Sequence, residues 1–153
     1  MSGKTHKGKY RPRNPEKYKG DPTDIVFRSS WERTFMKWCD LNESVKKWAS
    51  EEMHIAYFDP MQKKTRRYFP DFVIQVMDSD GLIQTHVIEV KPHAEVVGPP
   101  TNPKRKTKSW VYAVKMYVNN QAKWEAAREY CKKRGWEFKI ITEYELGLKK
   151  RPK

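Results

Sequence analysis

The chain has 153 residues, of which 37% are hydrophobic and 33% charged, and its formal net charge is +13. This length suits one domain with a sizeable core. No apolar run reaches membrane-spanning length, and no signal-peptide-like apolar stretch follows the basic start. We expect Cys39 and Cys131 to be free thiols, and no zinc site, because the His and Cys residues lack paired ligand spacing.

The positive charge is concentrated in three segments. Residues 1–20 carry seven Lys and Arg against Glu16 alone, while residues 101–109 and 149–153 carry four basic residues each and no acidic one. The rest of the chain is therefore close to neutral. Basic segments around a neutral body suit a polyanion such as DNA, although basic tails can also serve only solubility.

Composition divides the chain into three parts. Residues 1–23 are polar, basic and interrupted by prolines, which predicts a flexible arm. Residues 24–147 carry the periodic apolar patterns of a folded domain. Residues 148–153 form a basic tail.

The elements of the domain follow in chain order. Apolar residues at helical spacing predict a helix over 29–42, and Ser29 with Glu32 three residues later makes a capping box. Strands are then expected over 45–50, 53–58, 66–76 and 85–92, the last two as a hairpin, followed by a loop over 93–109, a helix over 110–134 ended by Gly135, and a strand over 136–142. This order predicts an α/β fold in which helices flank a mixed central β-sheet.

Three charged residues stand in the two hairpin strands. Asp71 lies in the first, and Glu89 and Lys91 end the second, where their spacing of two puts them on one face. Carboxylates and a lysine among Val, Ile and Phe are costly to bury unless their charge is compensated. A divalent metal would compensate it, and a carboxylate-bound metal is what phosphodiester hydrolysis requires.

These residues carry a family resemblance. The segments Phe27–Glu32, Tyr68–Phe72 and Ile88–Pro92 resemble, in order, the motifs of the PD-(D/E)xK, or restriction-endonuclease-like, superfamily, and in particular the endonuclease A-subunit of heteromeric transposases. In its length, basic arm and Tyr10-Arg11-Pro12 start, the chain is more similar to the small head-completion nucleases of large tailed phages.

The resemblance implies a DNA endonuclease that uses Mg²⁺, with Mn²⁺ as a substitute, and leaves a 5′-phosphate and a 3′-hydroxyl. It further implies action in phage head completion, in the host cytoplasm during virion assembly or in the virion, with DNA and head, portal or neck proteins as partners and no membrane. Two rival hypotheses remain: a nuclease for transposon ends or branched DNA, and a head component that binds DNA without cutting it.

The resemblance also assigns roles to residues. Asp71, Glu89 and the Val90 carbonyl would bind the metal, and Lys91 would orient or deprotonate the attacking water. Lys91 taken alone could instead be an ion-pair partner of Glu89. Glu32 has two open interpretations, a third metal-binding carboxylate or only the capping partner of Ser29.

Basic residues outside the motifs are candidates for contact with the DNA backbone. They are Arg28, Lys63, Lys64, Arg66, Arg67, His93, Lys104, Arg105, Lys106 and Lys108. Each could equally be a solvated residue of a hairpin or loop. The stripe of the second helix, including Gln121 and Lys123, is interpreted mainly as core. No element for base-specific readout is apparent, so binding should depend on phosphate contacts or DNA shape.

Overall fold

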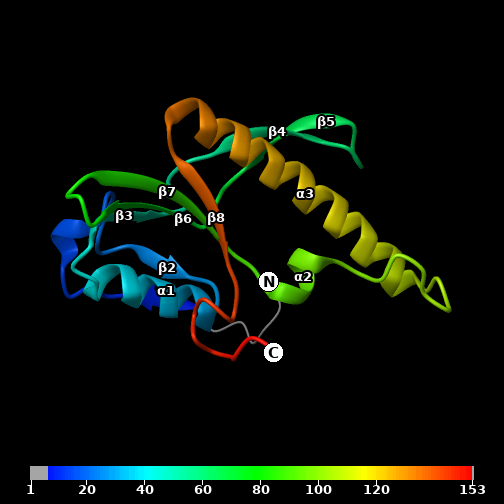
Figure 1. Cartoon of the computed structure of the whole chain (residues 1–153), viewed down its shortest axis with the longest axis horizontal. Helices are drawn as coiled ribbons and strands as arrows, with labels where there is room; N and C mark the ends of the chain where they lie inside the picture. The colour runs from blue at the N-terminus through cyan, green and yellow to red at the C-terminus, as the bar shows by residue number, and fades with distance from the viewer. Residues whose placement is uncertain (1–6, 153) are drawn as a thin grey trace.

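A four-stranded mixed sheet in the order β3-β6-β7-β8 forms the centre of the computed structural model, which describes residues 7–152 (Figure 1). β3 (Val45–Ser50), β6 (Phe72–Met77) and β7 (Ile83–Val90) pair antiparallel, and β8 (Glu137–Ile141) runs parallel to β7. A parallel neighbour requires a long crossover, which the segment between β7 and β8 provides. The predicted mixed α/β fold and the β6–β7 hairpin are confirmed.

The two long helices lie on opposite faces of this sheet (Figure 1). α1 (Ser30–Leu41) packs Phe35 and Met36 against Ile88 and Val90 of β7. Residues alternate along a strand, so Glu89 faces the other side, towards α3 (Lys108–Arg134). The α1 face of β7 is therefore packed with apolar side chains, while its α3 face carries the charged end of the strand.

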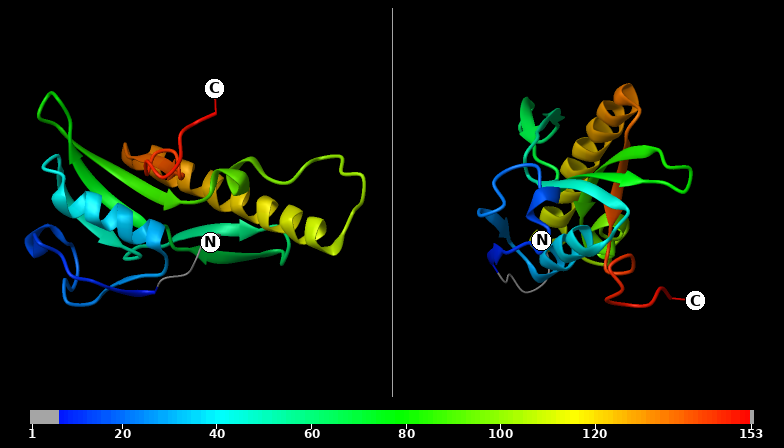
Figure 2. Two further views of the ribbon diagram at one scale, coloured as in Figure 1. Left: turned by 90° about the horizontal axis from the view of Figure 1, so that it is seen from below. Right: turned by 90° about the vertical axis from the view of Figure 1, so that its left-hand side faces the viewer.

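A second small hairpin packs beside α3. β4 (Ile55–Asp59) pairs with β5 (Lys64–Tyr68), and Ile55, Tyr57 and Tyr68 share a core with Trp124 and Ala127 of α3. The two hairpin strands run alongside the helix (Figure 2).

The expected single strand over 66–76 is wrong, because the structure divides it into two strands, β5 and β6, joined by a short irregular segment. Phe69, Pro70 and Asp71 lie outside both strands. Pro70 has no N–H to donate to a sheet and is tolerated only at edges or bulges. The break lets β5 pair with β4 while β6 enters the central sheet, and it leaves Asp71 at the start of β6.

The flexible arm expected over 1–23 is wrong as far as the structure describes it, while residues 1–6 lie outside the described part. β1 (Gly8–Tyr10) pairs with β2 (Ile25–Phe27), and a short 3₁₀ helix, η1 (Pro15–Lys17), follows β1. Tyr18 is buried in the α1 core. This segment is ordered because β1 pairs with β2 through backbone hydrogen bonds and because the Tyr18 ring packs in the core.

The segments outside the sheet differ from the expectations at one point and agree at others. The loop expected over 93–109 contains a one-turn helix, α2 (His93–Val97), before it reaches α3. Gly135 ends α3 in the left-handed conformation, with φ 70°, as predicted. Cys39 and Cys131 are free thiols, as predicted, and both are buried. Within residues 7–152, no helix is long and apolar enough to cross a membrane.

Candidate active site

Three elements meet at one end of the central sheet: the start of α1, the break before β6 and the end of β7. Register sets this meeting, because Phe72 of β6 pairs with Ile88 of β7. Asp71, one residue before β6, therefore lies beside the end of β7, and its Oδ2 accepts a hydrogen bond from the Val90 N–H at 2.8 Å. Asp71 and Glu89 line one open groove of about 590 Å³.

Asp71 is held in a strongly acidic environment. Burial and the nearby Glu89 carboxylate raise the pKa of Asp71 well above its usual range, and Glu32 raises it further. The Val90 N–H and the Lys91 charge oppose this rise without cancelling it. A carboxylate cluster with too little positive charge favours either a proton or a cation.

Glu89 and Lys91 share a face, as their spacing predicts. Lys91 Nζ lies 3.8 Å from Glu89 Oε2, and both side chains are largely buried. The backbone N–H of Lys91 donates to the Ile141 carbonyl of β8, whereas the preceding N–H, that of Val90, faces Asp71. In this structure Lys91 is thus an ion-pair partner of Glu89 and also stands beside the acidic groove.

Glu32 connects the helix start with the acidic cluster. Its N–H donates to Ser29 Oγ at 3.1 Å, so Ser29 is the N-cap, and its Oε1 accepts from the Arg28 N–H at 3.3 Å. Burial raises the pKa of Glu32, the Glu51 and Glu89 charges add to the rise, and Arg28 opposes it. The two interpretations of Glu32 are therefore not exclusive, since it engages its own helix start within the field of Glu89.

The donor set suits a hard cation, which prefers oxygen ligands and, in the case of Mg²⁺, retains several waters. Among residues 7–152, no three acidic, His or Cys side chains converge as a ready ion cage. A metal here would be held by the Asp71 and Glu89 carboxylates and completed by water. Val90 adds a carbonyl, since an extended residue directs its C=O to the same edge as its N–H, which faces Asp71. The role of Glu32 as a third ligand stays a prediction.

The sequence predicted a mainly core position for Lys123, whereas the structure shows that it lines the same groove from α3. Its Nζ lies 5.8 Å from the centre of the Tyr68 ring and 5.9 Å from that of Tyr57. Burial lowers the pKa of Lys123, although the Glu89 charge opposes the change. The sequence signal for this position was the spacing of Lys123 from Asn120 and Trp124, which places the lysine beside the side of α3 that is buried in the structure.

Two more groove residues were not singled out. Burial, followed by the Glu89 charge and a side-chain hydrogen-bonding interaction with Glu89, raises the pKa of the Tyr68 hydroxyl. Glu51 has a left-handed backbone with φ 53°, and its N–H donates to the Asp71 carbonyl. A non-glycine residue in the left-handed conformation is typical of functional sites.

The predicted DNA contacts are dispersed. Arg28 and Arg67 line the groove, and Arg28 forms an ion pair with Glu51 at 2.9 Å. Arg66 instead pairs with Asp59 at 3.5 Å. None of the remaining basic candidates lines this groove: Lys63 and Lys64 are exposed on the β4–β5 hairpin, and Lys104, Arg105, Lys106 and Lys108 are exposed before and at the start of α3. Their contact with DNA stays a prediction.

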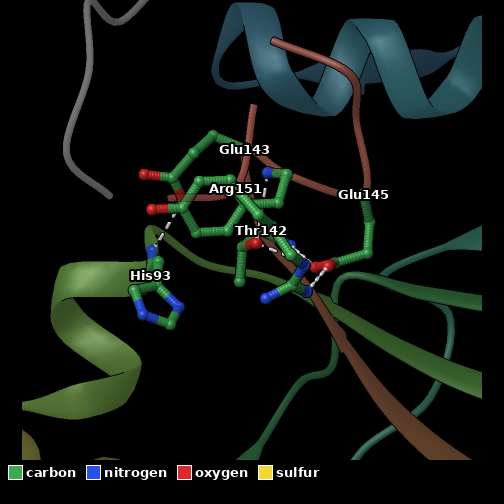
Figure 3. Close-up of polar contacts among 6 residues, drawn as sticks. His93, Thr142, Glu143, Glu145 and Arg151 are labelled. Carbon is green, nitrogen blue, oxygen red and sulfur yellow. Dashed lines mark hydrogen bonds and ion pairs between the residues drawn. The ribbon is translucent and has the colours of Figure 1, made fainter. Parts of the chain in front are cut away.

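His93 is held by the C-terminal segment. Its N–H donates to Glu143 Oε1 at 2.8 Å, and its ring meets Tyr144 edge-on with centroids 5.1 Å apart. Nearby, Glu145 accepts hydrogen bonds from Thr142 and forms an ion pair with Arg151 (Figure 3). His93 therefore links the chain just after β7 to the C-terminal segment, and its contact with phosphate stays a prediction.

Comparison with known proteins agrees with this geometry. Residues 42–143 match the family model described as TnsA-like endonuclease N terminal, a range that includes Asp71, Glu89 and Lys91. The chain is also 40% identical over 142 residues to the head completion nuclease of Enterobacteria phage T4, an alignment that covers 90% of this chain and 91% of that protein. The chain therefore belongs to the family of TnsA-like, restriction-endonuclease-like nucleases.

Proposed function

We propose that the protein is a Mg²⁺-dependent endodeoxyribonuclease that acts on DNA during phage head completion. The observation that carries the proposal is the convergence of Asp71 and Glu89 in one open groove, with Lys91 paired to Glu89. The 40% identity to a head completion nuclease supports the biological setting. The proposed setting is the host cytoplasm during assembly, or the virion, with head, portal or neck proteins as partners.

The acidic residues would hold the metal. Asp71, Glu89 and the Val90 carbonyl provide oxygen ligands at one edge of the sheet. When bound, Mg²⁺ would supply Lewis acidity at the phosphate and lower the pKa of a coordinated water. Burial and the neighbouring Glu89 charge, which raise the pKa of Asp71, support this assignment because a bound cation would compensate both.

The basic residues would manage the phosphate and the proton. The ion pair with Glu89 would position the Lys91 ammonium. The remaining N–H groups of this ammonium would hydrogen-bond the attacking water and stabilise the negative charge that develops on the phosphate. Lys123 extends into the groove from α3, with its Nζ near the Tyr68 ring. Together they would place positive charge where the negative charge of the transition state develops, and the products would be a 5′-phosphate and a 3′-hydroxyl.

A plasmid-nicking assay tests this proposal. We expect the wild-type protein to convert supercoiled DNA to nicked or linear forms with Mg²⁺ or Mn²⁺ and not with EDTA, and to leave ends that a DNA ligase can rejoin. D71N should abolish cleavage while it retains DNA binding. D80N is the matched control, because Asp80 is an exposed aspartate in the β6–β7 turn.

The assay also separates the rival functions. Cleavage by D71N at the wild-type rate, or cleavage in EDTA, would exclude the proposed mechanism. Binding of DNA without any cleavage by the wild-type protein would favour a head component that binds DNA and does not cut it.

A further inference from the structure

A second groove of about 400 Å³ lies between the N-terminal segment and α1, and it shares no lining residue with the active-site groove. Its walls are Tyr10, Arg11, Arg13, Arg33, Lys37 and Leu41. Four of these six residues are cationic, and no carboxylate lines the groove. Nothing in the mechanism above uses them.

One wall is a single face of α1. Arg33, Lys37 and Leu41 are spaced four residues apart, so their side chains stack along the helix. Arg33 and Lys37 are separated by about 6 Å along the axis, at 1.5 Å per residue, a length that covers about two successive phosphates of one DNA strand.

The other wall is fixed by buried contacts. Asp40 is 0% exposed, and its carboxylate accepts hydrogen bonds from the Tyr10 hydroxyl at 2.7 Å and from the backbone N–H groups of Arg13 and Asn14 at 2.8 and 2.9 Å. Lys17 Nζ donates to three carbonyl oxygens at the C-terminal end of α1. Arg11 and Arg13 are therefore attached to a held backbone, and the groove is part of the fold.

The four cations are free to meet an anion. Among the ion pairs of the described residues, none involves Arg11, Arg13, Arg33 or Lys37. The nearest carboxylate, Asp40, is turned to Tyr10 and the backbone. Like charges gathered in this way repel one another, and a polyanion would relieve that repulsion.

The groove continues the positive side of the active site. Arg28 lines the active-site groove, and the Arg33 guanidinium lies 5.9 Å from the centre of the Phe27 ring, one residue before Arg28. Arg33 also directly follows Glu32 in α1. Positive groups thus run from Arg28 past Arg33 to Lys37, around the start of the helix.

We propose that this groove binds the sugar–phosphate backbone of duplex DNA beside the cleaved bond, so that the protein holds one flank of its substrate as well as the scissile phosphate. The proposal rests on the proposed function, because it assumes a DNA substrate. Duplex backbone is favoured over an acidic protein segment, because the four cations are exposed and the two on α1 follow one helix face over a length that covers about two phosphates.

The test measures binding by R33Q/K37Q in a D71N background, so that DNA is not cut, with fluorescence anisotropy across a salt series. On a 30-base-pair duplex, we expect the log–log salt slope to fall by about 1.8, at about 0.9 for each lost phosphate contact. On a duplex too short to leave the active-site groove, the slope should not change. R33K/K37R should keep the parent slope.

The matched control is K132Q/K133Q, which removes two exposed cations from the last turn of α3, on the opposite face of the sheet. An unchanged slope for R33Q/K37Q on the long duplex, or an equal loss in the control, would overturn the groove proposal. Normal DNA binding with a defect only in head assembly would assign the groove to a protein partner. Nicking by the protein with intact Asp71 tests the proposed function separately, so the two failures are distinguishable.

Discussion

The protein contains two aspartates in enclosed positions with opposite electrostatics. Asp40 holds the N-terminal segment on α1, whereas Asp71 lies in the candidate active site. Asp40 accepts three hydrogen bonds through its carboxylate, and these lower its pKa although burial alone would raise it. Asp71 accepts one, from Val90, and burial with the neighbouring Glu89 raises its pKa. A carboxylate surrounded by donors stabilises the fold, whereas one surrounded by carboxylates requires a cation.

The two grooves repeat this contrast. The Asp40 carboxylate is hydrogen-bonded to Tyr10 and the backbone, so the groove beside it is lined by four cations and no carboxylate. The Asp71 groove presents acidic and basic groups together, the arrangement expected where a metal and a phosphate meet. The comparison predicts that equivalent substitutions at the two aspartates have opposite consequences.

The largest expected effect is on cleavage. D71N should reduce the rate by about a thousandfold or more, because a catalytic metal contributes several kcal/mol to the transition state and each 1.4 kcal/mol is about tenfold. D40N, measured per folded molecule in the same nicking assay, should stay within about threefold of wild type. A comparable loss of rate in a fully folded D40N protein would erase the distinction between the two aspartates.

A smaller effect on cleavage is expected at Lys123. K123Q should lower kcat by about a hundredfold, as removal of a donor to a developing oxyanion does, with little change in KM. K123R should recover part of the rate because it restores the charge. Single-turnover cleavage of a labelled duplex measures this. A rate unaffected by K123Q would return Lys123 to the role of a core-lining residue.

Stability should show the reverse order. D40N should reduce the free energy of unfolding by about 2 kcal/mol, because an amide cannot accept all the hydrogen bonds that the carboxylate accepts and leaves buried donors unpaired. Without metal, D71N should be neutral or stabilising, because it removes a charge that the apo site disfavours. Urea unfolding in EDTA measures both variants.

The stability difference between wild type and D40N should depend on pH. The pKa of Asp40 in the folded protein is lowered from 3.8. A group with a lowered folded pKa contributes stability above its unfolded pKa and loses that contribution as pH falls through the folded pKa. The difference should be complete above about pH 5 and should close at pH values below 3.8. A stability difference between wild type and D40N that stayed constant at pH values where Asp40 is protonated would contradict the role of the Asp40 charge.

The smallest predicted effect is the response to metal. Mg²⁺ at ten times its dissociation constant should stabilise the wild-type protein by about 1.4 kcal/mol through mass action, and should leave D71N unchanged. Thermal unfolding with Mg²⁺, and with Na⁺ at matched ionic strength, separates binding from screening. Equal stabilisation of wild type and D71N would indicate a site elsewhere.

Several features of this protein were determined by local sequence. The spacing of two put Glu89 and Lys91 on one face, the Ser29 hydroxyl capped α1, and Gly135 ended α3, because strand period, helix caps and left-handed backbone depend on a few neighbouring residues. The motif order also identified Asp71 and the family. These signals were sufficient for the acidic half of the site.

Only the tertiary structure decided the rest. Tyr10 and Asp40 are 30 residues apart, and their hydrogen bond turns an expected arm into one wall of a groove. Pro70 divided one expected strand between two sheets, and the packing of α3 on Tyr57 and Tyr68 brought Lys123 into the site. Local patterns give the period and ends of an element, but contacts between distant residues depend on how the elements pack, which no short stretch of sequence encodes.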